Sequence, residues 1–292
     1  MNSVVSPGLA DSVDVAAAAP IAGWRAHLDL EFERRGERSV LAARRHDGPL
    51  VVQKSLHPEG EGICHAIVVH PPAGIAGGDQ LALRASLGEN SHAVLATPGA
   101  AKWYRSAGAW ARQDIDFALA ANAVLEWLPQ ESIFYDGSRA QSRTHVRLDR
   151  GARYLGWEIF CFGRKGAGVA MTMGDFDLGM NIAIEGKAGF IERGEFAAGS
   201  GFFSSPAGLD GKSVCGSLIA VAEGVDASLL AKCRAVIPSQ GEGGVTLLPG
   251  MLVARYLGHV SEAAKNYFIA LRRLLRPILA NCEAADLRIW ST

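Results

Sequence analysis

The chain has 292 residues, of which 49% are hydrophobic and 20% are charged, and its formal net charge is -1. This composition can bury a sizeable core, which excludes a disordered chain, and the length allows one large domain or two ordinary ones. Because Lys and Arg only balance Asp and Glu, no basic field exists to gather phosphate backbones, which argues against nucleic acid as a partner.

Residues 1–22 mix Ser, Ala, Gly and Pro without a period, which predicts a flexible N-terminal tail. Asp11 and Asp14 are acidic, and no basic region or long apolar stretch accompanies them, so the segment does not resemble a signal peptide. No run in the chain reaches the roughly 18 apolar residues of a membrane-spanning helix. We therefore expect a cytoplasmic protein without a membrane partner.

Alternating apolar and polar residues begin at Trp24, and this period of two predicts a half-buried strand. Similar short runs follow, separated mostly by Gly, Asp, Asn or Pro. They span 38–44, 49–53, 63–70, 80–87, 91–97, 112–119, 122–128, 142–148, 152–161, 177–186 and 188–196. Almost no helical pattern precedes residue 225, so the sequence predicts a sandwich, a barrel or a stacked β-helical sheet and argues against βαβ units.

The chain after residue 224 has a different pattern. Val225–Ala235 is a plausible short helix, and a longer helix is predicted over 261–276, with Ser261 as its N-cap and Pro277 near its end. Its apolar residues at helical spacing are Ala264, Phe268, Leu271, Leu274 and Leu275. The predicted organisation is a tail over 1–22 and a single domain over 23–292, β-rich over 23–224 and mixed with helices over 225–292.

Cysteine usage argues against a disulfide framework. The five cysteines are far apart and form no C-x-x-C pair, which fits a reducing compartment.

Residues 64–79, CHAIVVHPPAGIAGGD, concentrate the side chains that could carry chemistry. Strand alternation places Cys64 and His70 on one face and His65 on the other. Cys64 is either a metal ligand completed by neighbouring strands or a small buried residue. A glycine-rich turn leads to Asp79, which either points into a cavity as an oxygen donor or hydrogen-bonds to turn amides.

Two strands carry one carboxylate among large apolar residues, Glu126 and Glu158, and Glu131 follows the first of them. A carboxylate in such a place must be at a surface, paired, or lining a wet interior. The segment containing Trp103, Tyr104 and Arg105 could anchor a partner or pack on the sheet. No G-x-S-x-G, H-E-x-x-H or phosphate-loop motif is present, so the sequence gives no sign of an enzyme.

Taken together, these segments resemble the urease accessory protein family UreD, called UreH in some organisms. The landmarks cover about residues 23–165 in order. They are GWRAHLDL (23–30), GPLVVQK (48–54), HPE (57–59), CH (64–65), HPPAGIAGGD (70–79), TPGAAKWYRS (97–106), LEWLPQE (125–131) and GR (163–164). The C-terminal half matches more loosely, through LVARYL (252–257), LRP (275–277) and RIWST (288–292).

The resemblance implies a non-enzymatic maturation factor, mainly β, with a layered β-helical arrangement of many short strands and a small C-terminal helical part. It implies binding to the urease apoprotein, to UreF and, through UreF, to the GTPase UreG, so that nickel reaches the dinickel site of urease. No tightly bound cofactor is implied, only transient Ni²⁺. An internal water-filled tunnel, as in the family, would give interior carboxylates and thiols a physical rationale.

Residue by residue, Asp79 matches the aspartate of the family's Gly-Gly-Asp motif, which the resemblance assigns to nickel passage. Further candidate donors on the route are Glu126, Glu131, Glu158, Cys64 and His65, and the candidate partner contacts are Trp103, Tyr104 and Arg105. Sparse oxygen donors suit transfer, because a closed His and Cys cage would trap Ni²⁺. The sequence departs from the family at Val169, where a glutamate is usual, since valine cannot bind a metal.

Two alternatives stay open. A metal-dependent hydrolase would need Asp79, His65 or His70 and a carboxylate to converge within about 2.0–2.2 Å of one ion. A structural adaptor would hold urease open without contacting nickel.

Overall fold

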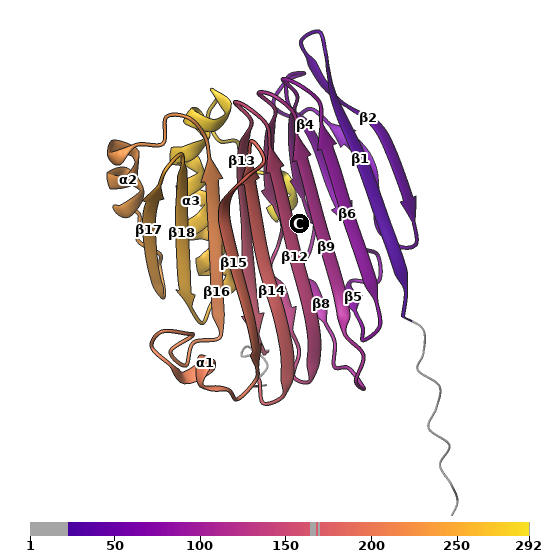
Figure 1. The fold of residues 1–292 in the computed structure, drawn as a ribbon, viewed down its shortest axis with the longest axis vertical. Coiled ribbons are helices and arrows are strands. Elements are labelled where there is room, and N and C mark those ends of the chain that lie inside the picture. Colours follow the sequence, from indigo (N-terminus) through magenta and orange to yellow (C-terminus); the bar gives the residue numbers. More distant parts are fainter. Residues whose placement is uncertain (1–22, 164–167, 169, 292) are drawn as a thin grey trace, which may run out of the picture.

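The computed structural model describes residues 23–163, 168 and 170–291, and it shows two β-sheets stacked face to face with a long helix against one of them (Figure 1). The predicted tail over 1–22 lies outside the described residues, as do Arg164 of the GR landmark and Val169.

The helices and strands follow one another from β1 to a short C-terminal 3₁₀ turn. They are β1 (Arg25–Arg35), β2 (Arg38–Asp47), β3 (Val51–Leu56), β4 (Cys64–Val69), β5 (Gly74–Ile75), β6 (Gln80–Leu87), β7 (His92–Ala96), β8 (Ala101–Trp103), β9 (Ala111–Leu119), β10 (Val124–Leu128), β11 (Ser132–Phe134), β12 (Ser138–Leu148), β13 (Arg153–Phe162), β14 (Gly174–Ile184), β15 (Lys187–Ala197), α1 (Gly201–Ser204), β16 (Val214–Val221), α2 (Ala227–Arg234), β17 (Glu242–Leu248), β18 (Met251–Gly258), α3 (Ser261–Ala280) and the 3₁₀ turn Arg288–Ser291.

The middle of the chain winds as a β-solenoid in which each coil gives one longer strand to each sheet and one short strand at the side of sheet B. Successive coils run β4–β5–β6, β7–β8–β9 and β10–β11–β12, followed by β13 and β14. Equivalent strands pair in parallel, β6–β9–β12–β14 in one sheet and β4–β7–β10–β13 in the other. Of the three architectures that the sequence left open, the structure has the stacked β-helical one.

Further strands extend both sheets beyond the coils, and each of these pairings is antiparallel except that of β1 with β6, which is parallel. Sheet A has the order β15-β14-β12-β9-β6-β1-β2. Sheet B has the order β17-β18-β16-β13-β10-β7-β4-β3, with β5, β8 and β11 joined at its side. Side chains alternate across each strand, so every strand presents one row to the gap between the sheets.

Two hydrophobic cores result from this layering. The first fills most of the gap between the sheets and includes Phe117, Trp127 and Phe176. The second lies between the outer face of sheet B and α3, where Trp157 packs against Phe268 with ring centroids 6.2 Å apart. Sheet B is therefore covered on both faces.

The two predicted helices are present as α2 and α3. In α2 the side chain of Asp226 accepts a hydrogen bond from the Leu229 amide at 2.8 Å, as an N-cap should. The prediction that Ser261 caps α3 is wrong, because Val260 holds the cap position and Ser261 is the first helical residue. The helix also continues through Pro277, because its buried face extends to Leu279. Within the described residues, no helix is long and apolar enough to cross a membrane.

Candidate functional site

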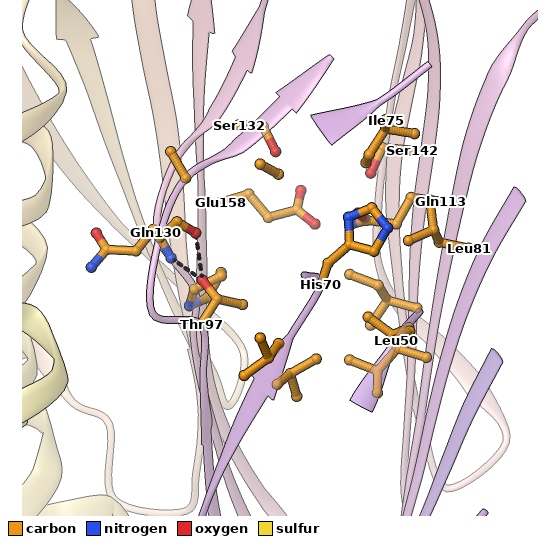
Figure 2. Close-up of a pocket in the computed structure, with 18 of the residues that line it drawn as sticks. Leu50, His70, Ile75, Leu81, Thr97, Gln113, Gln130, Ser132, Ser142 and Glu158 are labelled. Atoms are coloured by element: carbon orange, nitrogen blue, oxygen red, sulfur yellow. Dashed lines mark hydrogen bonds between the residues drawn. The ribbon is translucent and has the colours of Figure 1, made fainter. Parts of the chain in front are cut away.

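A cavity of about 190 Å³ lies between the two sheets (Figure 2). Its walls are mostly apolar, and its polar side chains are His70, Thr97, Gln113, Gln130, Ser132, Ser142 and Glu158. One water occupies about 30 Å³ in the liquid, so the cavity has room for several waters or a hydrated metal ion.

The polar wall on sheet A comes from inward-facing positions that would normally carry apolar residues. Ser142 of β12 lies opposite Gln113 of β9, and both line the cavity. The inward row of β12 also carries Thr144 and then becomes apolar from Val146 onward. The inward face of sheet A therefore carries a polar patch of Gln113, Ser142 and Thr144 with apolar residues on both sides of it, and the cavity lies beside this patch.

Glu158 of β13 extends into this cavity from sheet B (Figure 2). Its Oε1 accepts a hydrogen bond of 2.5 Å from Thr144 Oγ1, across the gap between the sheets. Burial raises the pKa of Glu158 to about 7, the Thr144 hydrogen bond opposes this, and the charge of Glu192 adds to it. No Lys or Arg of the described chain pairs with this carboxyl group, so it can bind a mobile cation.

His70 enters the cavity from the other side, just after β4 (Figure 2). Burial lowers the pKa of its imidazole, against the opposing charge of Asp79. The ring is therefore neutral at pH 7, which is the form that binds metals.

Orphaned polar groups indicate that the cavity is wet. The indole Nε1–H of Trp127, whose ring lines the cavity, has no protein partner among the described residues. The buried hydroxyl of Tyr154, which is outside the cavity lining, has no partner among the described residues either, and its pKa is raised well above its usual range by burial and by the charge of Glu158. Buried polar groups of this kind are normally satisfied by ordered water.

Asp79 lies in the turn that follows β5, and its carboxylate is occupied by backbone amides. Oδ1 accepts from the Trp24 amide and Oδ2 from the Ala76 amide, both at 2.8 Å. Of the two possibilities that the sequence left open for Asp79, the geometry shows amide binding. The carboxylate nevertheless lies close enough to His70 to act on its pKa.

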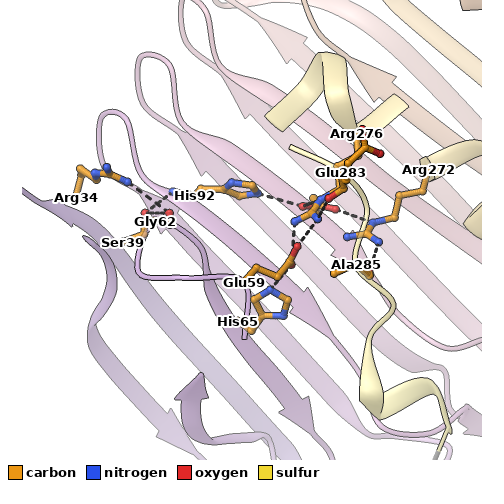
Figure 3. A network of polar contacts seen from close by, with 11 residues as sticks. Arg34, Ser39, Glu59, Gly62, His65, His92, Arg272, Arg276, Glu283 and Ala285 are labelled. Carbon is orange, nitrogen blue, oxygen red and sulfur yellow. Dashed lines mark hydrogen bonds and ion pairs between the residues drawn. The ribbon is translucent and has the colours of Figure 1, made fainter. Parts of the chain in front are cut away.

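Glu126 and His65 face away from the cavity and belong to a buried ion cluster between sheet B and α3 (Figure 3). Glu126 is fully buried and accepts from Arg272 Nε at 2.7 Å, Arg276 Nε at 2.9 Å and His92 Nε2 at 3.1 Å. Burial opposes its ionisation, but these partners hold the pKa of Glu126 well below its usual range.

The second half of this ion cluster is built on Glu59. Its carboxylate accepts from His65 Nε2 at 2.7 Å and from both Nη atoms of Arg276, one of them at 2.9 Å. Burial alone would raise the pKa of Glu59, but the hydrogen bonds lower it to about 2. Arg272 and Arg276 also donate to the carbonyls of Ala285 and Glu283, so the ion cluster fixes the C-terminal segment to sheet B.

The remaining candidate donors also lie outside the cavity. Glu131 is half-buried and accepts a hydrogen bond from Ser261 Oγ at 3.3 Å, which ties it to the start of α3. Cys64 is buried in the core between the sheets, and burial raises the pKa of its thiol, so no thiolate is available as a ligand at neutral pH. The predicted faces are confirmed, since Cys64 points inward and His65 outward.

One of the three predicted partner contacts does not reach the surface. Trp103 is fully buried, with its ring 5.5 Å from that of Phe134, so it cannot meet a partner. Tyr104 is 39% exposed and stacks edge-on against Tyr135, and Arg105 pairs with Asp136 at 2.8 Å on the surface.

The sequence had not identified Gln113, Ser142 and Thr144 as part of the site. A signal was present, because each is a polar residue in the inward register of its strand, where the same row also carries apolar residues such as Ile115 and Val146. The signal is weak, since nothing in one sequence says which inward rows face each other.

The donors required by the hydrolase alternative are kept apart. His65 lies on the outer face of sheet B with Glu59, and Asp79 is bound to amides. In the described part of the chain, no three His, Cys, Asp or Glu side chains gather as a metal site.

Comparison with known proteins identifies the family of this chain. The model of a family described as "UreD urease accessory protein" matches residues 25–291. The chain belongs to the UreD urease accessory protein family. Relatives named urease accessory protein UreD include one from Azoarcus sp., 52% identical over 94% of this chain and 96% of its own length, and one from Dechloromonas aromatica, 50% identical over 92% and 95%. A UreD from Pseudomonas aeruginosa is 44% identical over 92% of this chain and 95% of its own length. The relatives are named as accessory proteins and not as enzymes, which agrees with the expectation from the sequence.

Replacing Arg276 tests the role of the ion cluster. Arg276→Met leaves Glu59 and Glu126 short of a buried cation, so we expect the free energy of unfolding to fall by about 3–5 kcal/mol in urea denaturation. Arg273→Met is the matched control on the same helix, because its pair with Asp286 is exposed and such pairs contribute less than about 1 kcal/mol. Equal losses in the two variants would contradict the role of the cluster in holding α3.

The pKa of Glu158 predicts a pH-dependent stability. Between pH 4.5 and 7 the folded chain retains a proton on Glu158 that the unfolded chain has released, so stability falls as pH rises through this window. Glu158→Gln removes the penalty and should be the more stable protein at pH 8 by up to about 3 kcal/mol, at about 1.4 kcal/mol for each step of one in pKa. Urea denaturation at pH 5 and pH 8 measures this. A difference between the variants that is the same at both pH values would refute the assignment.

Proposed function

We propose that this chain is a urease maturation factor that binds the urease apoprotein and UreF, with UreG joined through UreF, and that conducts Ni²⁺ through the cavity between its sheets. The observation that carries the proposal is Glu158, a carboxyl group without a fixed cation in a cavity wide enough for water. Membership of the UreD family supplies the process that the cavity would serve.

The chemistry of the cavity suits transfer better than storage. One carboxylate and one neutral imidazole can replace two water ligands of Ni²⁺, while the other ligands stay water and exchange readily. A closed set of thiolates and imidazoles would bind the ion too tightly to release it. Glu158 and His70 are therefore the donors we assign, with Asp79 beside His70.

The adaptor alternative does not explain the carboxyl group of Glu158 between the sheets. A scaffold that never contacts nickel gains nothing from a carboxyl group whose burial raises its pKa and costs stability at neutral pH. The other candidate nickel donors have different partners. Glu126 and His65 belong to the ion cluster that holds α3, and Glu131 contacts Ser261. For partner contacts, Tyr104 and Arg105 are the accessible candidates.

The test is the nickel content and activity of urease from cells that express the urease subunits and the other accessory proteins, with and without this chain. Inactive, nickel-poor urease in its absence, restored on adding it back, is the expected result. Equal nickel and activity in both preparations would overturn the maturation role.

A variant separates the conduit from the adaptor. Glu158→Gln keeps the shape of the side chain but loses its charge, so we expect urease nickel to fall about tenfold, equivalent to about 1.4 kcal/mol of metal binding, while the partners remain bound. Glu33→Gln, at an exposed carboxylate on β1, is the control and should deliver nickel normally. Full nickel delivery by Glu158→Gln would favour the adaptor.

A further inference from the structure

Two matched rows of side chains lead from Glu158 toward β15, the edge strand of sheet A, which lies across the gap from β18 of sheet B. On sheet B, Glu158 lies beside Ser217 of β16, which lies beside Arg255 of β18. On sheet A, the corresponding row is Thr144, Met180 and Glu192, on β12, β14 and β15. The neighbours in each row share one face of their sheet, since directly paired residues point the same way.

Polar contacts join the two rows at both ends. At the inner end Thr144 donates to Glu158, at the cavity. At the outer end Arg255 pairs with Glu192 across the gap between the sheets, and Arg255 Nη1 also donates to Ser217 Oγ at 2.7 Å. The outer pair is in contact with solvent, because the side chains of Arg255 and Glu192 are 46% and 38% exposed.

The outer pair is joined to the row that begins at the cavity. Arg255 contacts both Glu192 of sheet A and Ser217 of sheet B, and Ser217 is the direct strand neighbour of Glu158. Glu158 and Glu192 are therefore the carboxylates at the inner and outer ends of the two rows, and Arg255 is the cation that contacts the outer one.

We propose that Arg255 and Glu192 form a gate for a divalent cation at the outer end of this row. Glu192 is the second carboxylate donor on the route, and the guanidinium of Arg255 holds its place until the cation displaces it. This inference rests on the proposed nickel transfer. It adds a second metal site and a direction of transfer, from the cavity toward β15 at the edge of sheet A.

The surroundings of the ion pair allow a divalent cation to displace Arg255 from Glu192. An exposed guanidinium that leaves its carboxylate is rehydrated at little cost, and the charge it leaves behind is neutralised by the incoming ion. Met180 lies between Thr144 and Glu192 and is buried, and its thioether side chain is flexible enough to move aside.

A purely structural bridge between the sheets would behave differently when its two halves are removed. If the ion pair is only a structural bridge, a variant of Arg255 and a variant of Glu192 lose the same interaction. Both variants should then change stability in the same direction and leave Ni²⁺ binding unchanged. A gate predicts opposite effects on Ni²⁺ binding, because one half is a donor and the other competes with the ion.

The experiment measures binding of Ni²⁺ alone to the full chain by equilibrium dialysis. We expect Arg255→Met to tighten binding about tenfold by removing a like charge, and Glu192→Gln to weaken it about tenfold. Arg255→Lys keeps the cation and should bind like the unaltered chain. Glu195→Gln is the control, because this carboxylate is on the same strand, exposed, and paired with Arg193 outside the row. Thermal melting of every variant confirms that it is folded.

The results separate the gate from the function on which it rests. If the unaltered chain binds Ni²⁺ and Glu158→Gln loses it, while Arg255→Met and Glu192→Gln both bind as the unaltered chain does, the gate is overturned and the conduit stands. If the unaltered chain binds no Ni²⁺ and urease nickel is the same with and without it, the proposed function fails and the gate with it. Opposite shifts in the two variants support the gate.

Discussion

The carboxyl group of Glu158, held between two sheets by one threonine hydroxyl and no fixed cation, is the interaction from which the functional account follows. Removing a carboxyl group from water is costly unless charge or water compensates it. Here the compensation comes from protonation near neutral pH and from a cavity that has room for water. A site that tolerates a proton, water or a metal ion in turn has the properties that a passage for Ni²⁺ requires.

The carboxylate of Glu126 is also removed from water, but fixed cations of the protein compensate its charge. Glu126 is fully buried, whereas Glu158 is half-buried. Arg272, Arg276 and His92 satisfy the charge of Glu126, which fixes α3 and the C-terminal segment on sheet B. The two carboxylates are on neighbouring strands, β13 and β10, yet they face opposite sides of the same sheet. Sheet B therefore separates the ion cluster, on its face under α3, from the cavity beside Glu158, on its face toward sheet A.

The sequence predicts the strands well because alternation is a local property. Most predicted runs correspond to strands within a few residues, but β5, β8 and β11 have only two or three residues and show no period.

The partners of buried charges cannot be predicted from local patterns. The apolar spacing of α3 predicts the helix, but it does not predict that Arg272 and Arg276 are buried, because their partner Glu126 lies 146 and 150 residues away in the chain. From sequence alone Glu126 and Glu158 look the same, and only these distant partners distinguish them. For Asp79 two possibilities are open from the sequence, and the amide of Trp24, which is 55 residues away, decides between them.

The central claim is that Ni²⁺ occupies the cavity beside Glu158, and anomalous diffraction at the nickel edge from crystals of this chain soaked in Ni²⁺ tests it most directly. The account predicts an anomalous peak between Glu158 and His70, with the metal about 2.0–2.2 Å from its protein donors. Peaks confined to histidines on the outer surface, with none in the cavity, would contradict it.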